Sequence, residues 1–225
     1  MEILRLPCWS NDKLKNDICI YHDIENIQNA TAKGKGVLVL AAHMGNWEIG
    51  LSSASANGVD THAVTKEIKG TTGQYVADRM RNDHGVHTIP RRNSIRDILR
   101  VLKKGGALGF VLDQNMTSDE GIFVEFFNRP ACTMPGLAVI AQRSGAPVVP
   151  VQFYRDDDGI HHHVRFHPEV EWEEVSDDRD ENVCHNTQRY TKILEDLIRE
   201  HPEQWLWMHR RWRTQPEQTE TGFGQ

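Results

Sequence analysis

The chain has 225 residues, of which 38% are hydrophobic and 26% are charged, and its net charge at pH 7 is −6. This composition is that of an ordinary globular domain, and the acidic balance argues against a general nucleic-acid-binding protein. No apolar run approaches the roughly 20 residues that a membrane-spanning helix needs, and the N-terminus lacks a signal-peptide pattern. We expect a single domain over residues 1–225, with a core at 35–215 and peripheral segments at 1–34 and 216–225.

Apolar, β-branched runs alternate along the chain with helical patterns. The predicted strands cover residues 37–42, 62–65, 87–89, 107–113, 123–127, 148–154 and 161–166. The predicted helices cover residues 47–56, 72–84, 94–104, 135–144, 182–200 and 202–212. Strands that alternate with helices of this length are typical of α/β folds, so we expect a mostly parallel central sheet flanked by helices. A turn of three aspartates and a glycine at 156–159 predicts a hairpin between the last two strands.

The most informative stretch is 37–50, where a buried strand runs into His43 and Glu48 follows five residues later. Positions five apart in a helix lie about 140° from each other and do not share a face. The two side chains can therefore meet only if His43 ends the strand and Glu48 lies in the first turn of the next helix. Gly45 permits the sharp bend between them. A histidine held by a carboxylate suits a general base; the alternative is a strand-end histidine that caps a helix.

A second polar group follows the strand predicted near residue 110. Asp113, Gln114 and Asn115 come directly after its apolar run. In parallel α/β sheets, sites form beyond the carboxyl ends of the strands, where we also expect His43. Asp113 could orient an arginine or the acceptor, while the two amides could donate hydrogen bonds. The alternative is a simple turn in which Asp113 bonds its own backbone.

Arginines supply a third set of candidates. Arg79 and Arg81 lie near the end of a predicted helix, and Arg129 precedes a proline. Arginine suits bidentate phosphate contact or stabilisation of an oxyanion. Residues 79–104 hold eight Lys or Arg against two acids, which favours a positive patch and an anionic partner. The alternative for the patch and for each arginine is an ordinary solvated surface.

Several patterns limit the chemistry. No G-x-S-x-G elbow and no other serine or cysteine nucleophile is apparent, which favours direct transfer between two bound substrates over a covalent intermediate. The four cysteines form no C-x-x-C pair, so we expect reduced thiols in a cytosolic setting and no structural zinc. Three histidines at 161–163 would alternate between the faces of a strand, so they do not converge on one metal ion.

The segment from 205 to 213 is both aromatic and basic. It holds Trp205 and Trp207, followed by a histidine, three arginines and a further tryptophan. This mixture is typical of a membrane interface, where tryptophan lies at headgroup depth and cations meet anionic lipid. The alternative is a helix that packs on the core with a charged outer face.

Four blocks of the sequence together resemble one known family. The blocks are the H-x4-E pattern at 43–48, the arginine block at 78–81 with the helix at 98–105, the Asp-Gln-Asn segment at 113–115, and the His-Pro-Glu-Gln to His-Arg-Arg-Trp signature at 201–212. In this order, they resemble the blocks of the late acyltransferases of lipid A biosynthesis, which include lauroyl and myristoyl transferases, within the lysophospholipid acyltransferase superfamily. Asn115 stands where many members of the family have an aspartate.

The resemblance implies a lysophospholipid acyltransferase-like fold and transfer of an acyl chain to a hydroxyl of a lipid A precursor. The donor it implies is an acyl carrier protein thioester or acyl-CoA. By analogy, His43 is the base, Glu48 orients it, Arg79 or Arg81 stabilises the oxyanion or the acceptor phosphate, and Asp113 supports the site. The expected substrate-binding residues are Asn46, Gln114, Asn115 and Arg129. No metal or other cofactor is expected.

The resemblance also implies a peripheral location at the cytoplasmic face of the inner membrane, on an anionic surface. Family members carry a longer region with a membrane helix before the first block, whereas 42 residues precede His43 here and none of them can span. We therefore expect a peripheral homologue, a truncated form or a fragment. Three other functions stay open: an acyltransferase for another lipid or glycolipid, a lipid-binding protein without catalysis, and a thioesterase.

Overall fold

A seven-stranded sheet forms the centre of the computed structural model, which describes residues 5–65, 71–91 and 94–216. The strand order is β1-β9-β8-β2-β5-β3-β4. Their bounds are β1 Cys19–His22, β2 Val37–Ala41, β3 Thr61–Thr65, β4 His87–Pro90, β5 Ala107–Val111, β8 Val148–Arg155 and β9 His162–Phe166. Neighbouring strands run parallel except at β8 and β9, which pair antiparallel. The expected mostly parallel α/β sheet is thus confirmed.

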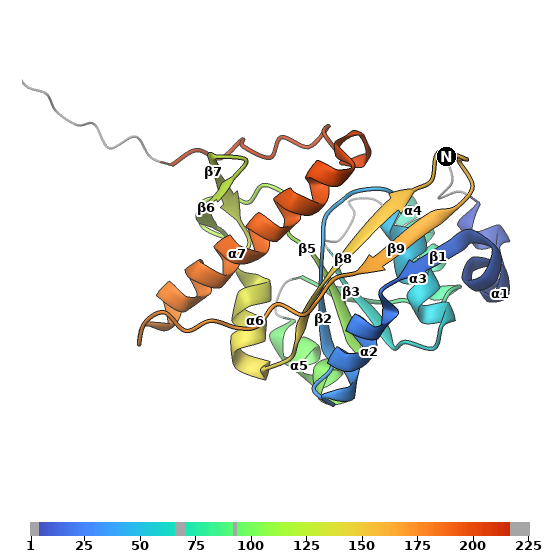
Figure 1. The fold of residues 1–225 in the computed structure, drawn as a ribbon, viewed down its shortest axis with the longest axis horizontal. Coiled ribbons are helices and arrows are strands. Elements are labelled where there is room, and N and C mark those ends of the chain that lie inside the picture. The colour runs from blue at the N-terminus through green and yellow to red at the C-terminus, as the bar shows by residue number, and fades with distance from the viewer. Residues whose placement is uncertain (1–4, 66–70, 92–93, 217–225) are drawn as a thin grey trace, which may run out of the picture.

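Helices cover both faces of this sheet (Figure 1). One face packs against α5 (Ile95–Lys103), α6 (Gly136–Ser144) and the long α7 (Arg179–Glu200). The other packs against α2 (Ile24–Ala32) and α3 (Trp47–Ala56), while α4 (Thr71–Asn82) packs on β4. Even-numbered residues of β2 belong to the first core, and odd-numbered ones to the second, as the two-residue period of a strand requires.

The N-terminal segment lies beside α3 and α4. Its short helical turns are η2 (Leu6–Cys8), α1 (Asn11–Lys13) and η3 (Leu14–Ile18). Leu6 and Leu14 are fully buried and form a small apolar cluster with Ile49 of α3 and Met80 of α4. This cluster, together with the parallel pairing of β1 and β9, ties the segment to the main body.

The bend between β2 and α3 has the form expected from the sequence. Gly45 has a positive φ of 54°, and a Cβ at this position would lie 2.6 Å from the carbonyl oxygen of Phe153. Both the backbone conformation and the close approach therefore require glycine. Asn46 caps α3, since its side chain accepts a hydrogen bond from the Ile49 amide at 3.3 Å. His43 consequently ends the strand, and Glu48 lies in the first turn of α3.

Other elements differ from the sequence expectation. The hairpin at 156–159 is confirmed by the pairing of β8 with β9. The strand predicted at 123–127, however, joins a separate two-stranded sheet as β6 (Ile122–Phe126), paired with β7 (Arg129–Thr133). The helix predicted at 202–212 is replaced by the short turn η4 (Pro202–Gln204) and an irregular segment that crosses the carboxyl edge of the sheet. Within the described ranges, no helix has both the length and the apolar character needed to cross a bilayer.

Candidate active site

His43 and Asp113 lie opposite each other at the carboxyl edge of the sheet. The parallel pairing of β2 and β5 sets Val37 against Ala107, Val39 against Gly109 and Ala41 against Val111. Two residues further along the same register, the His43 Nδ1 atom lies 2.7 Å from the Asp113 Oδ1 atom. We call this arrangement the His43–Asp113 pair. It is produced by strand pairing between segments 70 residues apart in the chain.

The carboxylate of Asp113 accepts three hydrogen bonds. Its Oδ1 atom accepts from the His43 ring, and its Oδ2 atom accepts from the His43 backbone amide at 2.9 Å and from the Trp205 indole at 2.7 Å. Burial raises the pKa of Asp113, but the hydrogen bond and charge of His43 and the bond from Trp205 outweigh burial, so the pKa is lowered. Asp113 is therefore a buried, ionised acceptor, and the proton of a neutral His43 ring is held on Nδ1.

The second ring nitrogen of His43 faces the polar end of the site. Its Nε2 atom lies 3.3 Å from the side-chain amide nitrogen of Gln114. The edge of the ring meets Trp47 in a T-shaped contact with the ring centroids 4.8 Å apart. With Nδ1 held by Asp113, Nε2 carries the lone pair, as a general base requires.

The structure corrects the expected partner of His43. Glu48 is buried in the first turn of α3, but both of its carboxylate oxygens accept hydrogen bonds from Arg81, one of them from Nε at 3.0 Å. Burial lowers the pKa of Arg81, but the hydrogen bond and charge of Glu48 outweigh burial and raise it. Asp113 holds the position expected for Glu48, and Arg81 is paired with Glu48.

The remaining predicted site residues make contacts elsewhere in the fold. Asn46 is the helix cap described above. Asn115 turns away from His43, because its side chain donates to Thr214 at 2.9 Å. Arg79 is exposed and contacts Tyr75 and Asp83 of its own helical region. Arg129 lies on β7, where its guanidinium covers the Trp212 ring at 4.8 Å. These contacts do not bring Arg79 or Arg129 to His43.

Sequence reasoning missed how much of the site comes from residues 201–214, which we call the C-terminal strap. Besides Trp205, the strap supplies His209, whose Nε2 accepts a hydrogen bond from the backbone amide of Asn115 at 2.8 Å. Burial lowers the pKa of His209, which keeps Nε2 unprotonated and able to accept. The His-Arg-Arg-Trp signature was the available signal, but its mixture of aromatic and basic residues pointed to a membrane rather than to the site.

Arg211 of the strap also points into the interior of the protein. It is fully buried, donates to the Cys132 carbonyl at 2.8 Å and also hydrogen-bonds the Thr133 hydroxyl. Burial lowers its pKa to about 10, so the guanidinium stays charged at neutral pH. The strap is thereby joined to β7, on the far side of Trp205 from η4.

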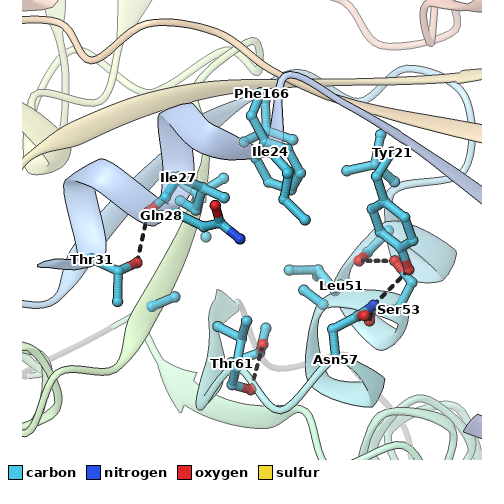
Figure 2. Close-up of a pocket in the computed structure, with 18 of the residues that line it drawn as sticks. Tyr21, Ile24, Ile27, Gln28, Thr31, Leu51, Ser53, Asn57, Thr61 and Phe166 are labelled. Carbon is cyan, nitrogen blue, oxygen red and sulfur yellow. Dashed lines mark hydrogen bonds between the residues drawn. The ribbon is translucent and has the colours of Figure 1, made fainter. Parts of the chain in front are cut away.

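An apolar pocket of about 570 Å³ lies on the face of the sheet that α2 and α3 cover (Figure 2). His43 and Asp113 are odd-numbered, like the residues of β2 and β5 that face this pocket, so the alternation of side chains along the two strands places the His43–Asp113 pair on the same face. The floor of the pocket includes Val39 and Gly109, which face each other in the register that continues to His43 and Asp113. On this face of the sheet, the pair Ala41 and Val111 lies between Val39–Gly109 and His43–Asp113. The walls come from α2, α3, β8 and β9, and include Ile24, Ile27, Leu51, Ala54, Val151, Phe153 and Phe166. Such a lining suits an aliphatic chain.

One side of the pocket carries polar side chains. Figure 2 shows Tyr21, Ser53 and Asn57 close together at one side, where the Asn57 amide donates to the Tyr21 hydroxyl at 2.8 Å. Trp47 contacts the His43 ring and also packs on the apolar cluster that contains Phe153. It therefore lies at the boundary between the His43–Asp113 pair and the pocket.

Within the part of the chain that the structure describes, no group of three or more His, Cys, Asp or Glu side chains is arranged to hold a metal ion. His162 is buried at the start of β9, whereas His161, just before the strand, and His163 are partly exposed, so neighbouring histidines alternate between faces as expected. His163 contacts His22 of β1, with ring nitrogens 2.7 Å apart. All four cysteines are free thiols.

Comparison with known proteins gives a consistent set of relatives. The profile of the family described as bacterial lipid A biosynthesis acyltransferase matches residues 1–214. A lipid A biosynthesis palmitoleoyltransferase of Escherichia coli (strain K12) is 29% identical over 194 residues, which cover 86% of this chain and 61% of the relative. The lauroyltransferase of the same organism is 25% identical, with the same coverage of both chains. A phosphatidylinositol mannoside acyltransferase of Mycolicibacterium smegmatis is 22% identical over 94% of this chain and 67% of its own. The chain thus spans about three fifths of the E. coli relatives.

Proposed function

Since the chain belongs to the bacterial lipid A biosynthesis acyltransferase family, we propose that it transfers a fatty acyl chain from a thioester to a hydroxyl of a lipid acceptor. The observation that carries the proposal is the His43–Asp113 pair, which holds the ring proton on Nδ1 and so leaves Nε2, beside the Gln114 amide, with the lone pair that a base needs. The proposed acceptor is a lipid A precursor, because the relatives from Escherichia coli are named for lipid A biosynthesis. The proposed donor is an acyl carrier protein thioester or acyl-CoA.

The proposed reaction needs no covalent intermediate on the protein. The acceptor hydroxyl replaces the Gln114 amide beside His43, and Nε2 takes its proton as the oxygen attacks the thioester carbonyl. The carbon–sulfur bond then breaks, and the proton on Nε2 passes to the departing sulfur. The products are an ester of the acceptor and a free thiol. Asp113 stabilises the transient imidazolium without taking its proton.

Turnover with and without an acceptor tests this function. The purified chain is incubated with acyl carrier protein thioesters or acyl-CoA, in the presence and absence of a lipid A precursor, and products are identified by mass spectrometry. We expect an acylated lipid and a free thiol in equal amounts. Acceptor-independent release of fatty acid as the main product would identify a thioesterase instead, and transfer only to another lipid would replace the proposed acceptor.

The apolar pocket is the proposed site of the acyl tail. Its floor belongs to the same strand register as the His43–Asp113 pair, so a chain that extends from the carbonyl along β2 and β5 enters the pocket. Gly109 leaves space on this floor, because a Cβ there would make only ordinary contact, with Leu51 at 3.4 Å. A larger side chain at this position would take up volume that the tail needs.

Replacing Gly109 with valine is expected to shorten the preferred acyl chain. Loss of burial for two or three methylenes, at about 0.8 kcal/mol each, lowers kcat/KM for the longest accepted donor by about 15- to 60-fold. Donors that are shorter by that length should be unaffected. The measurement is a kcat/KM series over donor chain length. Gly136→Ala, on α6 across the sheet, is the control, and an unchanged length profile in Gly109→Val would contradict the assignment of the pocket.

The cations of residues 79–104 offer less support for membrane binding than the sequence suggested. Arg79, Arg81, Arg91 and Arg100 each pair with an acidic side chain, and Arg92 lies outside the described residues. The strap offers a better surface, because Trp207 and Met208 are 58% and 90% exposed and lie next to the exposed Arg210. We propose that this surface meets anionic lipid at the cytoplasmic face of the inner membrane, next to the site.

Binding to vesicles tests the proposed membrane surface. The chain should sediment with vesicles that contain phosphatidylglycerol more than with neutral phosphatidylcholine vesicles, and binding should weaken as salt rises, because exposed charges are screened. Met208→Ser combined with Arg210→Ser should reduce binding several-fold. Val175→Ser, an exposed apolar residue in the loop before α7, is the matched control. Equal binding by the double variant and the unaltered chain would exclude the strap as the contact.

A further inference from the structure

The C-terminal strap is joined directly to the strand end that carries His43. The Leu206 amide donates to the His43 carbonyl at 2.9 Å, and the Gly45 amide donates to the Gln204 carbonyl at 3.0 Å. Between these two bonds, Trp205 forms a β-bridge with Met44. The backbone on both sides of His43 is therefore held by the backbone on both sides of Trp205.

The strap is also anchored on either side of this contact. The Gln204 side chain spans the backbone of Arg155 at the end of β8, accepting from its amide at 2.7 Å and donating to its carbonyl at 2.9 Å. On the other side, Arg211 binds the Cys132 carbonyl and the Thr133 hydroxyl of β7. Two fixed points thus limit the movement of Trp205.

The indole of Trp205 reaches the carboxylate that holds the His43 ring. Trp205 is 5% exposed and Asp113 is 3% exposed, so no bulk solvent competes for their 2.7 Å hydrogen bond. An indole nitrogen is only a donor and a carboxylate oxygen is only an acceptor, so the direction of the bond is certain. This bond and the His43 amide both occupy Oδ2, which leaves Oδ1 directed at the ring.

We propose that Trp205 is a positioning residue for the reaction: its indole N–H fixes the rotation of the Asp113 carboxylate and shares its negative charge, and so sets the basicity of His43. This inference rests on the proposed role of His43 as the base. Trp205 itself touches no reacting atom and acts only through Asp113.

The sign of the effect follows from the charge on Asp113. A donor withdraws negative charge from the carboxylate, and when the donor is removed more charge faces the imidazole. The protonated ring is then stabilised, so His43 keeps its proton to a higher pH and acts as a base over a narrower range. A residue that served only to pack the core would lower activity or stability without moving this limb of the pH profile.

The test compares Trp205→Phe with the unaltered chain in acyl-transfer assays over a range of pH. We expect kcat to fall by about tenfold with little change in KM, as is typical when a partner of a functional group is lost. The acid limb of the profile should move upward by about half a pH unit, roughly a quarter to a half of what one hydrogen bond to a charged group represents. The NMR titration of the His43 ring should move in the same direction, which gives a readout that does not depend on activity.

Two further variants separate positioning from packing. Trp212→Phe removes another indole N–H from the strap, one that donates to the Phe126 carbonyl at 3.3 Å, and should leave the acid limb in place. Incorporation of benzothienylalanine at position 205 keeps the bicyclic shape but lacks the N–H, so it should reproduce the shift even if the phenylalanine variant folds poorly. Thermal unfolding of each variant reports the fold.

The outcomes distinguish this inference from the proposed function. An acid limb and a His43 titration that stay in place in both position-205 variants would overturn the role of Trp205, even if substitution of His43 still abolished transfer. A shift in Trp212→Phe of the same size would also overturn it, because the effect would then belong to the strap in general. Full activity after loss of His43 would instead reject the proposed function itself.

Discussion

Replacing Asp113 with asparagine is expected to lower kcat by about 10³–10⁴-fold with little change in KM. Trp205 and the His43 amide donate to Oδ2, so the single oxygen of an asparagine amide must face these two donors. Its NH2 group then faces Nδ1 of His43, which can accept only if the ring proton moves to Nε2. The base would thus be blocked by its own proton. Steady-state kinetics, with NMR of the ring to identify the tautomer, measure this effect.

Glu48→Gln tests whether Asp113, as the structure indicates, or Glu48, as the sequence spacing predicted, is the carboxylate that supports His43. Because Glu48 pairs with Arg81 in a mostly buried position, its loss leaves the guanidinium without its partner and should cost about 3–5 kcal/mol of stability. The ring of His43 keeps its own carboxylate, so the acid limb of the pH profile should stay in place. A loss of kcat in Glu48→Gln equal to that in Asp113→Asn, with the fold intact, would show that Glu48 is the carboxylate that supports His43.

His43→Ala is expected to reduce transfer by at least about a thousandfold while the chain stays folded, because the base is removed and the partly exposed ring contributes little to the core. Adding Asp113→Asn to this variant should cause little further loss, since residues that act as one unit are not additive. The measurement is kcat for the two single variants and the double variant, with thermal unfolding as the check on folding. Retained transfer in His43→Ala would refute its role as the base.

Local patterns predicted the strand–bend–helix around His43 correctly. The continuous apolar run of β2, the glycine at 45 and the asparagine cap all act within a few residues of one another, so they can be read in order along the chain. The partner of His43 could not be read in this way. Its identity depends on β5 being the neighbour of β2, and strand order is a property of the whole sheet.

The C-terminal strap shows a second reason why a prediction from the sequence was wrong. Its mixture of aromatic and basic residues was compatible with a helix at 202–212 that packs on the core and has a charged outer face. In the fold, the indole of Trp205 and the guanidinium of Arg211 bind acceptors on Asp113 and β7, and the backbone that carries them is irregular, with an extended conformation at Trp205. Tertiary hydrogen bonds to buried groups outweigh a weak local propensity. Similarly, β6 was recognised as a strand, but its true partner β7, just after a tight turn, was not.

The shared register of β2 and β5 has a consequence for how this protein can change over time. Insertion or deletion of one residue in either strand would turn the following side chains to the opposite face of the sheet. Such an event would remove Asp113 from His43 and, in the same step, rearrange the floor of the pocket at Val39 and Gly109. Point substitutions on that floor, in contrast, leave the strand alignment intact. We therefore expect the lineage to tolerate variation in side-chain size at these two positions but not variation in the length of the two strands.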